Sequence, residues 1–399
     1  MGSLRQHFTG VAAKYLSAVD ATPRSHQHEI GSNAFVQILG DPRDQKVTFE
    51  GTFLYFDDES DTPLKATGVL TWYDTRLLQL HRGAEYRLYY RENVVTNRMS
   101  EGDFCVLAVR PDNTLMLVVS PCGSTSEQQI RWLFDVDHLP AKGFQVHEVE
   151  ERRQVSIIET MILEELGLEV RNDNDDWLGK VLDRFGERFP VTAEFSNFVR
   201  ETCRLAEPVQ TDPDSALLAW MEHEEMLFRT LERKIVQAQL DKGFSDVEHF
   251  IRFSLSVQNR RKSRVGHALE HHLAAVFEAH DLPFGRQVVT ENRATADFLF
   301  PGQKQYSDLD YPDERLVMLA SKSTCKDRWR QVLAEACRIK EKHLFTLEPA
   351  ISLNQTNEMK AHNLRLVVPS ALFGTYSCEQ KEWLLNLGAY LERVKYIIS

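Results

Sequence analysis

The sequence predicts a mostly-β domain followed by an α/β domain built on a central mixed sheet. Over residues 1 to about 140, short segments rich in aromatic and β-branched residues are separated by polar turns. After about residue 266, helical periodicity alternates with short apolar segments. At 399 residues the chain is long enough for two domains, each with its own core.

Short strands dominate the first part of the chain. We expect them at residues 47–56, 68–73, 85–90, 104–109 and 115–119. Pro111-Asp112-Asn113 lies between the last two segments and is a hairpin signal. Strands at this spacing are typical of a barrel or a sandwich.

The periodicity then changes to that of a helix over residues 146–167, which has an acidic outer face and ends at a glycine. The polar stretch 172–176 follows and is the preferred boundary. A second break at 207–214 precedes a long helix expected at 215–240. The predicted division is a β-rich domain at 1–145, a helix and linker at 146–180, and an α/β domain at 181–399.

The rest of the chain alternates between helices and strands. The expected helices cover residues 266–280, 327–342 and 351–362. The expected strands lie near 286–290, 297–300, 315–322, 343–347 and 364–368. This order predicts a mixed, partly parallel sheet.

A lysine and two carboxylates gather around the ends of two of these strands. Alternation along strand 315–322 places Lys322 at the end of an apolar row, where the sheet opens to solvent. Asp297 heads another apolar strand. In the helix expected at 327–342, Glu335 lies beside the buried stripe and can point back toward Lys322 and Asp297.

This set of side chains fits the hydrolysis of a phosphodiester. A magnesium ion held by Asp297 and Glu335 would neutralise charge on the phosphate and lower the pKa of a bound water. Lys322 would stabilise the hydroxide or the charge of the transition state. Glu270 is a further candidate carboxylate. Taken singly, such residues are more often a turn aspartate, a solvated lysine and a paired surface glutamate.

The composition bears on partners and compartment. The net charge of −12 would normally count against nucleic acid, but the positive charges cluster in two runs. The runs are Arg252, Arg260, Arg261, Lys262 and Arg264, and then Lys322, Lys326, Arg328 and Arg330. The 6 cysteines are scattered without a Cys-x-x-Cys pair, which fits a reducing cytoplasm. We see no apolar run near the roughly 20 residues that span a membrane.

Two competing patterns lie close to the candidate site. Residues 267–271 read His-x-x-Glu-His, an inverted zinc-protease pattern. Two histidines four apart could hold zinc with a third ligand, but ordinary helix histidines are the more frequent case. Cys325 beside Lys326 could act as a nucleophile, but no histidine partner is placed for it.

From about Val181 onward, the sequence resembles the catalytic domain of EcoRII-type restriction endonucleases, a branch of the PD-(D/E)XK nucleases. The matching stretches are NRRKSRVG at 259–266, DFLFP at 297–301, TCKDRWRQ at 324–331, HLFTL at 343–347 and LVVPS at 366–370. The resemblance implies an α/β restriction-endonuclease-like fold and Mg²⁺-dependent cutting of double-stranded DNA. It also implies Asp297, Lys322 and Glu335 as the catalytic set, with Glu270 as an accessory carboxylate. The usual proline before the aspartate is Ala296 here. Since that proline does no chemistry, we expect activity to survive.

The same resemblance assigns base reading to Lys326, Asp327, Arg328 and Arg330. Family members of this type read a short palindrome with C:G outer pairs, such as CCWGG or CCNGG. Arginine bonds bidentately to guanine, and a carboxylate accepts from cytosine N4. If these residues contacted only phosphates, Asp327 beside DNA would be hard to explain. Arg260, Arg261, Lys262 and Arg264 are expected to contact phosphates or to hold the geometry of the site.

Further expectations concern partners. Two symmetric strand cuts imply a homodimer, and the family implies a cognate DNA methyltransferase as a genetic partner. The first part of the chain resembles the family's N-terminal domain, a DNA-binding pseudobarrel of the plant B-three type. That resemblance implies an effector DNA site, with a domain that can block the catalytic cleft. The candidate DNA contacts are His28, Asn33, Arg76, Arg82, Arg87 and Arg91, for which exposed charges on a solvated sheet are an equal alternative.

Two other functions compete with a restriction endonuclease. One is a sequence-specific DNA-binding regulator with an inactive nuclease domain, against which the intact Asp297, Lys322 and Glu335 set argues. The other is a repair nuclease directed by DNA structure, against which the base-reading residues argue. The sequence leaves open the recognition site, its middle base and any dependence on methylation.

Overall fold

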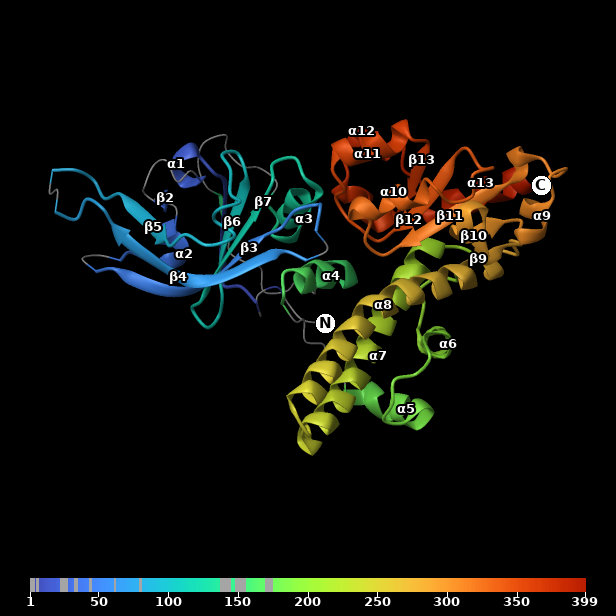
Figure 1. Ribbon diagram of the computed structural model, residues 1–399, viewed down its shortest axis with the longest axis horizontal. Helices are drawn as coiled ribbons and strands as arrows, with labels where there is room; N and C mark the ends of the chain where they lie inside the picture. The colour runs from blue at the N-terminus through green and yellow to red at the C-terminus, as the bar shows by residue number, and fades with distance from the viewer. Residues whose placement is uncertain are drawn as a thin grey trace. The chain divides into compact units, whose positions relative to one another are not determined.

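The computed structural model describes residues 4, 7–21, 28–31, 35–42, 45–60, 62–78, 81–136, 145–147, 156–168 and 175–399. The chain divides into two compact units, coloured along the sequence in Figure 1. The first unit is Met1–Arg171 with Ala350–Ser352, and the second is Asn172–Pro349 with Leu353–Ser399. The division at residues 145 and 181, and the role of each part, stay predictions.

The first unit is built on a mixed sheet whose described strands follow the order β2-β5-β4-β3-β7-β6-β1-β8. The strands are β1 (Gly10–Tyr15), β2 (Glu29–Gly31), β3 (Val47–Tyr55), β4 (Leu64–Asp74), β5 (Tyr86–Tyr90), β6 (Phe104–Val109), β7 (Leu115–Ser120) and β8 (Gln145–His147). The helices are α1 (Ala18–Ala21), α2 (Val36–Leu39), α3 (Thr125–Leu133) and α4 (Ile157–Glu165). Strands β3 and β7 pair in parallel, and β6 pairs antiparallel with β7 as the hairpin signal predicted. The mostly-β prediction is confirmed.

The sheet of the first unit has apolar cores on both faces. Strands β6 and β7 are buried along their whole length, so their runs are continuously apolar rather than alternating. Val106 and Val118 pack in one core with Ile130 of α3 and Ile162 of α4. The other core brings residues of β4 and β5 together with the opposite side chains of β6 and β7, as the sheet curls into a half-barrel.

The helix expected at 146–167 is wrong over its first part. Residues 145–147 form strand β8, which pairs with β1 at the end of the sheet. The described helix α4 begins only at Ile157, where Ser156 and Glu159 form a capping box. Residues 148–155 lie outside the described part of the chain.

The second unit has a mixed sheet in the order β13-β12-β11-β10-β9, which confirms the predicted α/β class. The strands are β9 (Gly285–Val289), β10 (Thr295–Phe300), β11 (Val317–Lys322), β12 (Lys342–Thr346) and β13 (Leu364–Val367). Strand β10 is antiparallel to both β9 and β11. Strands β11, β12 and β13 are parallel to one another. Two of the candidate catalytic residues, Asp297 and Lys322, lie on β10 and β11, where the antiparallel part of the sheet meets the parallel part.

Helices surround this sheet and extend away from it. They are α5 (Asp175–Phe185), α6 (Thr192–Thr202), α7 (Pro213–Lys242), α8 (Val247–Ala279), α9 (Gln303–Ser307), α10 (Trp329–Val332), α11 (Leu353–Ala361), α12 (Cys378–Lys381) and α13 (Leu387–Ile398). Short 3-10 segments occur at Glu291–Arg293, Asp313–Arg315, Lys326–Arg328 and Ser370–Thr375. Figure 1 shows α7 and α8 side by side as a long hairpin, with α5 and α6 against it.

The long helices begin and end where the sequence provides caps. Asp212 accepts from the backbone N–H of Ser215 at the start of α7, and Gly243 takes a φ of 77° at its end. Asp246 caps α8 in the same way, so this helix begins well before the predicted residue 266. Its other end packs against the sheet through Phe277, whose ring contacts Phe298 and Phe300. Among the described helices, none is long and apolar enough to span a membrane.

Candidate active site

Asp297 and Lys322 meet at the junction of two neighbouring strands. Phe298 of β10 lies opposite Leu319 of β11, so Asp297 faces the end of β11. The Asp297 carboxylate accepts from the backbone N–H of Ser321 at 2.8 Å and from Lys322 Nζ at 3.1 Å, both through Oδ2. Asp297 is buried and Lys322 is half-buried, so water screens this ion pair little.

Glu335 belongs electrostatically to the same group. Its pKa is raised to about 7, chiefly by burial and then by the carboxylate of Asp297, while Lys322 and Lys342 act in the opposite direction. The Glu335 side chain is 8% exposed. One of its oxygens, Oε2, is buried and has no hydrogen-bond partner among the described residues. The structure therefore brings together the three residues that the sequence singled out.

The helix expected at 327–342, which was to carry Glu335, is wrong. The helical turns end at Val332, and Glu335 lies in the irregular segment that follows. Lys342 Nζ donates to the backbone carbonyls of Glu335 and, at 3.1 Å, of Ala336. The backbone N–H of Ala336 donates to Thr290 Oγ1 at 3.3 Å. Since distant side chains satisfy its backbone, this segment does not need helical hydrogen bonds.

Glu270, the accessory carboxylate, is joined to Asp297 through a residue that the sequence analysis missed. Gln287 Nε2 donates to Glu270 Oε2 at 2.9 Å and to Asp297 Oδ1 at 3.0 Å. Arg286 also reaches Glu270 Oε2, at 3.3 Å, and contacts His271 Nδ1 at 2.8 Å. An exposed glutamine in a short strand carries no sequence signal, and only the register of β9 against β10 places it here.

The donor set fits a divalent cation with hard-oxygen preference. Among the described residues, no group of three or more His, Cys, Asp or Glu side chains is arranged to hold a metal ion. A magnesium site in a phosphoryl-transfer enzyme needs fewer protein ligands, since one or two carboxylates act together with waters and substrate phosphate. The Asp297 carboxylate and the unpartnered Glu335 Oε2 meet that requirement.

The structure gives little support to a zinc site at residues 267–271 or to Cys325 as a nucleophile. Burial, followed by the charge of Arg286, lowers the pKa of His271 to about 4, and its Nδ1 faces the Arg286 guanidinium. Cys325 is buried, and burial raises the pKa of its thiol well above the ordinary value. A buried thiol of this kind is a poor nucleophile.

The residues expected to read bases lie on the segment after β11. The Glu348 carboxylate accepts from the backbone N–H groups of Cys325 and Lys326, the latter at 3.1 Å. Lys326 is buried with a φ of 30°. Arg328 and Arg330 are exposed, and Arg330 forms an ion pair with Glu358 at 3.0 Å. The structure describes the backbone of Asp327. Base reading by these four residues stays a prediction.

The basic run on α8 divides into two kinds of residue. Arg260 and Lys262 are exposed. Arg261 Nη2 pairs with Glu232 at 2.6 Å, and the buried Arg264 pairs with Glu224 and Glu225 of α7. Arg261 and Arg264 thus join α8 to α7. The expected roles of the run, in phosphate contact or in the geometry of the site, stay predictions.

The candidate DNA contacts of the first unit are spread over several strands and turns. Arg76 pairs with Glu85 at 2.5 Å, and Arg87 contacts the same carboxylate. The His28 ring packs edge-on against Tyr90. Arg82 and Arg91 are exposed, whereas Asn33 lies outside the described residues. The role of all six stays a prediction.

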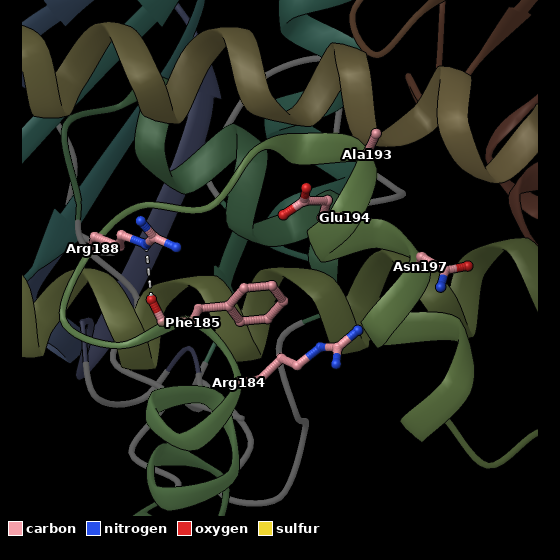
Figure 2. A pocket seen from close by; sticks show the side chains of 6 residues that line it. All are labelled: Arg184, Phe185, Arg188, Ala193, Glu194 and Asn197. Carbon is pink, nitrogen blue, oxygen red and sulfur yellow. Dashed lines mark hydrogen bonds between the residues drawn. The ribbon is translucent and has the colours of Figure 1, made fainter.

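A hollow of about 530 Å³ lies between α5 and α6 (Figure 2). It is lined by Arg184, Phe185, Arg188, Ala193, Glu194 and Asn197. Arg188 Nε donates to the backbone carbonyl of Phe185 at 3.3 Å, as the dashed line shows. None of the residues predicted to be catalytic lines this hollow.

Comparison with known proteins bears on a large part of the second unit. Residues 228–391 match the family model of the EcoRII C-terminal domain. This segment is therefore similar to that domain. It contains Asp297, Lys322, Glu335 and Glu270, so the resemblance seen in the sequence is confirmed over this part of the chain. The group of residues fits the PD-(D/E)XK class.

The EcoRII C-terminal match agrees with a full-length relative. The chain is 46% identical over 181 residues to the type II restriction enzyme EcoRII of Escherichia coli, which is 45% of this chain and 45% of that enzyme. The chain thus matches less than half the length of that relative.

Two solved structures are also similar. Metal-depleted Ecl18kI in complex with uncleaved, modified DNA is 16% identical, with a TM-score of 0.45 over 57% of this chain and 85% of that one. The restriction endonuclease PspGI in complex with substrate DNA is 14% identical, with a TM-score of 0.43 over 57% and 99%.

Proposed function

We propose that the protein is a type II restriction endonuclease that hydrolyses phosphodiesters of double-stranded DNA at a specific site. The observation that carries the proposal is the contact between Asp297 and Lys322, with the buried Glu335 electrostatically coupled to both. This group lies within the segment that matches the EcoRII C-terminal family model.

The residues of the chain divide the work as follows. Asp297 and Glu335 would hold Mg²⁺, which supplies charge neutralisation at the phosphate and an acidified water when bound. Lys322, fixed by Asp297, places a positive charge where the hydroxide and the transition state develop negative charge. Glu335 must lose its proton to act as a ligand, and its raised pKa makes this step sensitive to pH near neutrality.

Further parts of the proposal concern specificity and assembly. Exposed Arg328 and Arg330 follow the strand that ends at Lys322, so a base-reading segment would lie next to the cutting site. The proposed target is a short palindrome with C:G outer pairs, of the CCWGG or CCNGG kind. Two symmetric cuts require a homodimer. The first unit would bind a second, effector DNA site, and a cognate methyltransferase would protect the cell's own DNA in the cytoplasm.

Plasmid cleavage tests the proposal. Purified protein is incubated with plasmid DNA that carries many CCNGG sites, with Mg²⁺ or with EDTA. Lys322→Ala is the test variant and Lys304→Ala, an exposed lysine on α9, is the matched control. We expect discrete fragments only with Mg²⁺ and only when Lys322 is intact, and sequencing of the ends gives the site.

Each other outcome points to one of the alternatives. Tight DNA binding without cutting, even with added effector DNA and with methylated and unmethylated plasmid, indicates a regulator with an inactive nuclease domain. Cutting at branches or ends without a common sequence indicates a repair nuclease. Equal cutting by Lys322→Ala would refute the assigned mechanism.

A further inference from the structure

Gln287 occupies an unusual backbone position in strand β9. Its φ is 51°, which lies in the left-handed region that residues other than glycine, asparagine and aspartate seldom adopt. The neighbouring pairs Ala296↔Val288 and Phe298↔Arg286 keep the register of the two strands on either side of it. Gln287 therefore lies opposite Asp297 in this register, in a strained conformation at a position that is not itself paired in the ladder. Such strain is kept where the side chain has a specific task.

The side chain of Gln287 performs a bridging task. A single amide nitrogen, Nε2, donates to Glu270 Oε2 at 2.9 Å and to Asp297 Oδ1 at 3.0 Å. An amide NH₂ carries two donor hydrogens, so it can serve both carboxylates at once. It connects α8 to β10 without adding charge, while Lys322 Nζ and the Ser321 N–H hold the other oxygen of Asp297.

The bridge solves an electrostatic problem. Glu270 and Asp297 share one amide donor, and Asp297 also acts electrostatically on Glu335, so the acidic groups compete for few positive charges. Arg286 reaches Glu270 at 3.3 Å, and Lys322 reaches Asp297. Gln287 donates to the other carboxylate oxygen of Asp297, Oδ1, and so fixes the orientation of that carboxylate. Hydrogen-bond partners of metal-ligating carboxylates typically tune metal affinity by ten- to a hundredfold.

We propose that Gln287 is a positioning residue that couples Glu270 to Asp297 and orients the Asp297 carboxylate for a divalent cation. This inference rests on the proposed function, since it takes Asp297 as a metal ligand. It adds a residue that does not touch the reacting atoms and that acts through Asp297. The left-handed backbone is what lets a residue of β9 aim its amide at both carboxylates.

The test measures Mn²⁺ binding to the full chain without DNA, by electron paramagnetic resonance of free Mn²⁺. Gln287→Met keeps the length of the side chain but cannot donate, and Gln287→Gly removes the side chain while relieving the strained backbone. Asp297→Asn is the reference for a lost ligand. Gln303→Met, an exposed glutamine on α9, and Asp281→Gly, a left-handed residue with a φ of 56°, are the matched controls.

We expect both Gln287 variants to raise the Mn²⁺ dissociation constant by roughly tenfold or more, and the two controls to leave it unchanged. In cleavage assays the half-saturating Mg²⁺ concentration should rise by a similar factor, with kcat at saturating Mg²⁺ and DNA affinity in EDTA retained. If Gln287 had a merely structural role, its replacement would change the melting temperature and leave the Mn²⁺ dissociation constant unchanged.

Three results would overturn the inference. The first is an unchanged Mn²⁺ affinity in Gln287→Met while Asp297→Asn loses binding, which leaves the proposed function intact. The second is a loss in Gln287→Met that Gln287→Gly does not share, which indicates a backbone effect. The third is unchanged binding in Asp297→Asn, in which case the metal site of the proposed function fails as well.

Discussion

Replacing Glu335 with glutamine should make the metal-free protein more stable at alkaline pH. Burial and the neighbouring Asp297 raise the pKa of Glu335 from its ordinary value of 4.5 to about 7. The folded protein therefore binds this proton more tightly than the unfolded chain does. The favourable contribution of the protonated group is fully present below pH 4.5 and is lost as the pH rises through about 7. Above that pH the folded protein carries a buried charge that opposes folding.

The size of this effect follows from the pKa shift. At about 1.4 kcal/mol per pKa unit, the ionised group lowers the free energy of unfolding by about 3 kcal/mol at pH 8. At pH 5 the same shift amounts to only about 1 kcal/mol. Glu335→Gln carries no titrating group, so its free energy of unfolding should rise relative to wild type by about 2 kcal/mol between pH 5 and pH 8.

Urea unfolding at several pH values measures the difference. Glu382→Gln, an exposed glutamate on the segment after α12, is the matched control and should follow wild type at every pH. Saturating Mg²⁺ at pH 8 should stabilise wild type more than Glu335→Gln, because the cation offsets the buried charge only where the carboxylate is present. Parallel pH profiles for wild type and Glu335→Gln would refute this account of Glu335.

Three substitutions probe the packing around the site by urea unfolding. Lys342→Met removes the donor to the carbonyls of Glu335 and Ala336 and should cost about 3 kcal/mol; an unchanged midpoint would contradict the role given to this lysine. Arg264→Met leaves Glu225 with fewer partners in a buried network and should cost about 3–5 kcal/mol; a loss below about 1 kcal/mol would mean that the network is not important for stability. Trp329→Ala leaves a cavity at a fully buried position and should lower the free energy of unfolding by about 3–5 kcal/mol. An unchanged free energy of unfolding would show that neighbouring side chains move in to fill the cavity.

The pairing of Asp297 with Lys322 could be predicted because it depends on local patterns. Each residue lies in an apolar strand, and alternation fixes the face on which each side chain lies. When two such strands are neighbours in one sheet, few registers are possible for the side chains at their ends. The long helix α7 was predictable for the same reason, since its cap and periodicity lie in consecutive residues. Of α8, only the part from residue 266 onward was predicted.

The segment around Glu335 shows where such reasoning fails. Of the stripe that helical periodicity predicted to be buried, Trp329, Val332, Ala336 and Ile339 are buried, whereas Leu333 is only partly buried. The periodicity of apolar residues indicates which side chains are buried, however, and does not fix the backbone conformation. Ala336 has a φ of 47°, which does not occur in a right-handed α-helix. The backbone is held by Lys342 and Thr290, which lie in other strands and loops. Contacts of this range depend on the complete fold, so consecutive residues could not reveal them.

Gln287 gives the same lesson for the site itself. A search for chemistry in a sequence selects charged residues, because metals and phosphates need charge. A group of like charges also needs neutral donors that hold it together, and an amide offers two such donors without changing the net charge. The amide of Gln287 becomes significant only when the register of β9 and the position of α8 place two carboxylates within 3.0 Å of one nitrogen. Residues that arrange a catalytic group therefore have to be sought in the contacts of the folded chain, even where the group itself is evident from the sequence.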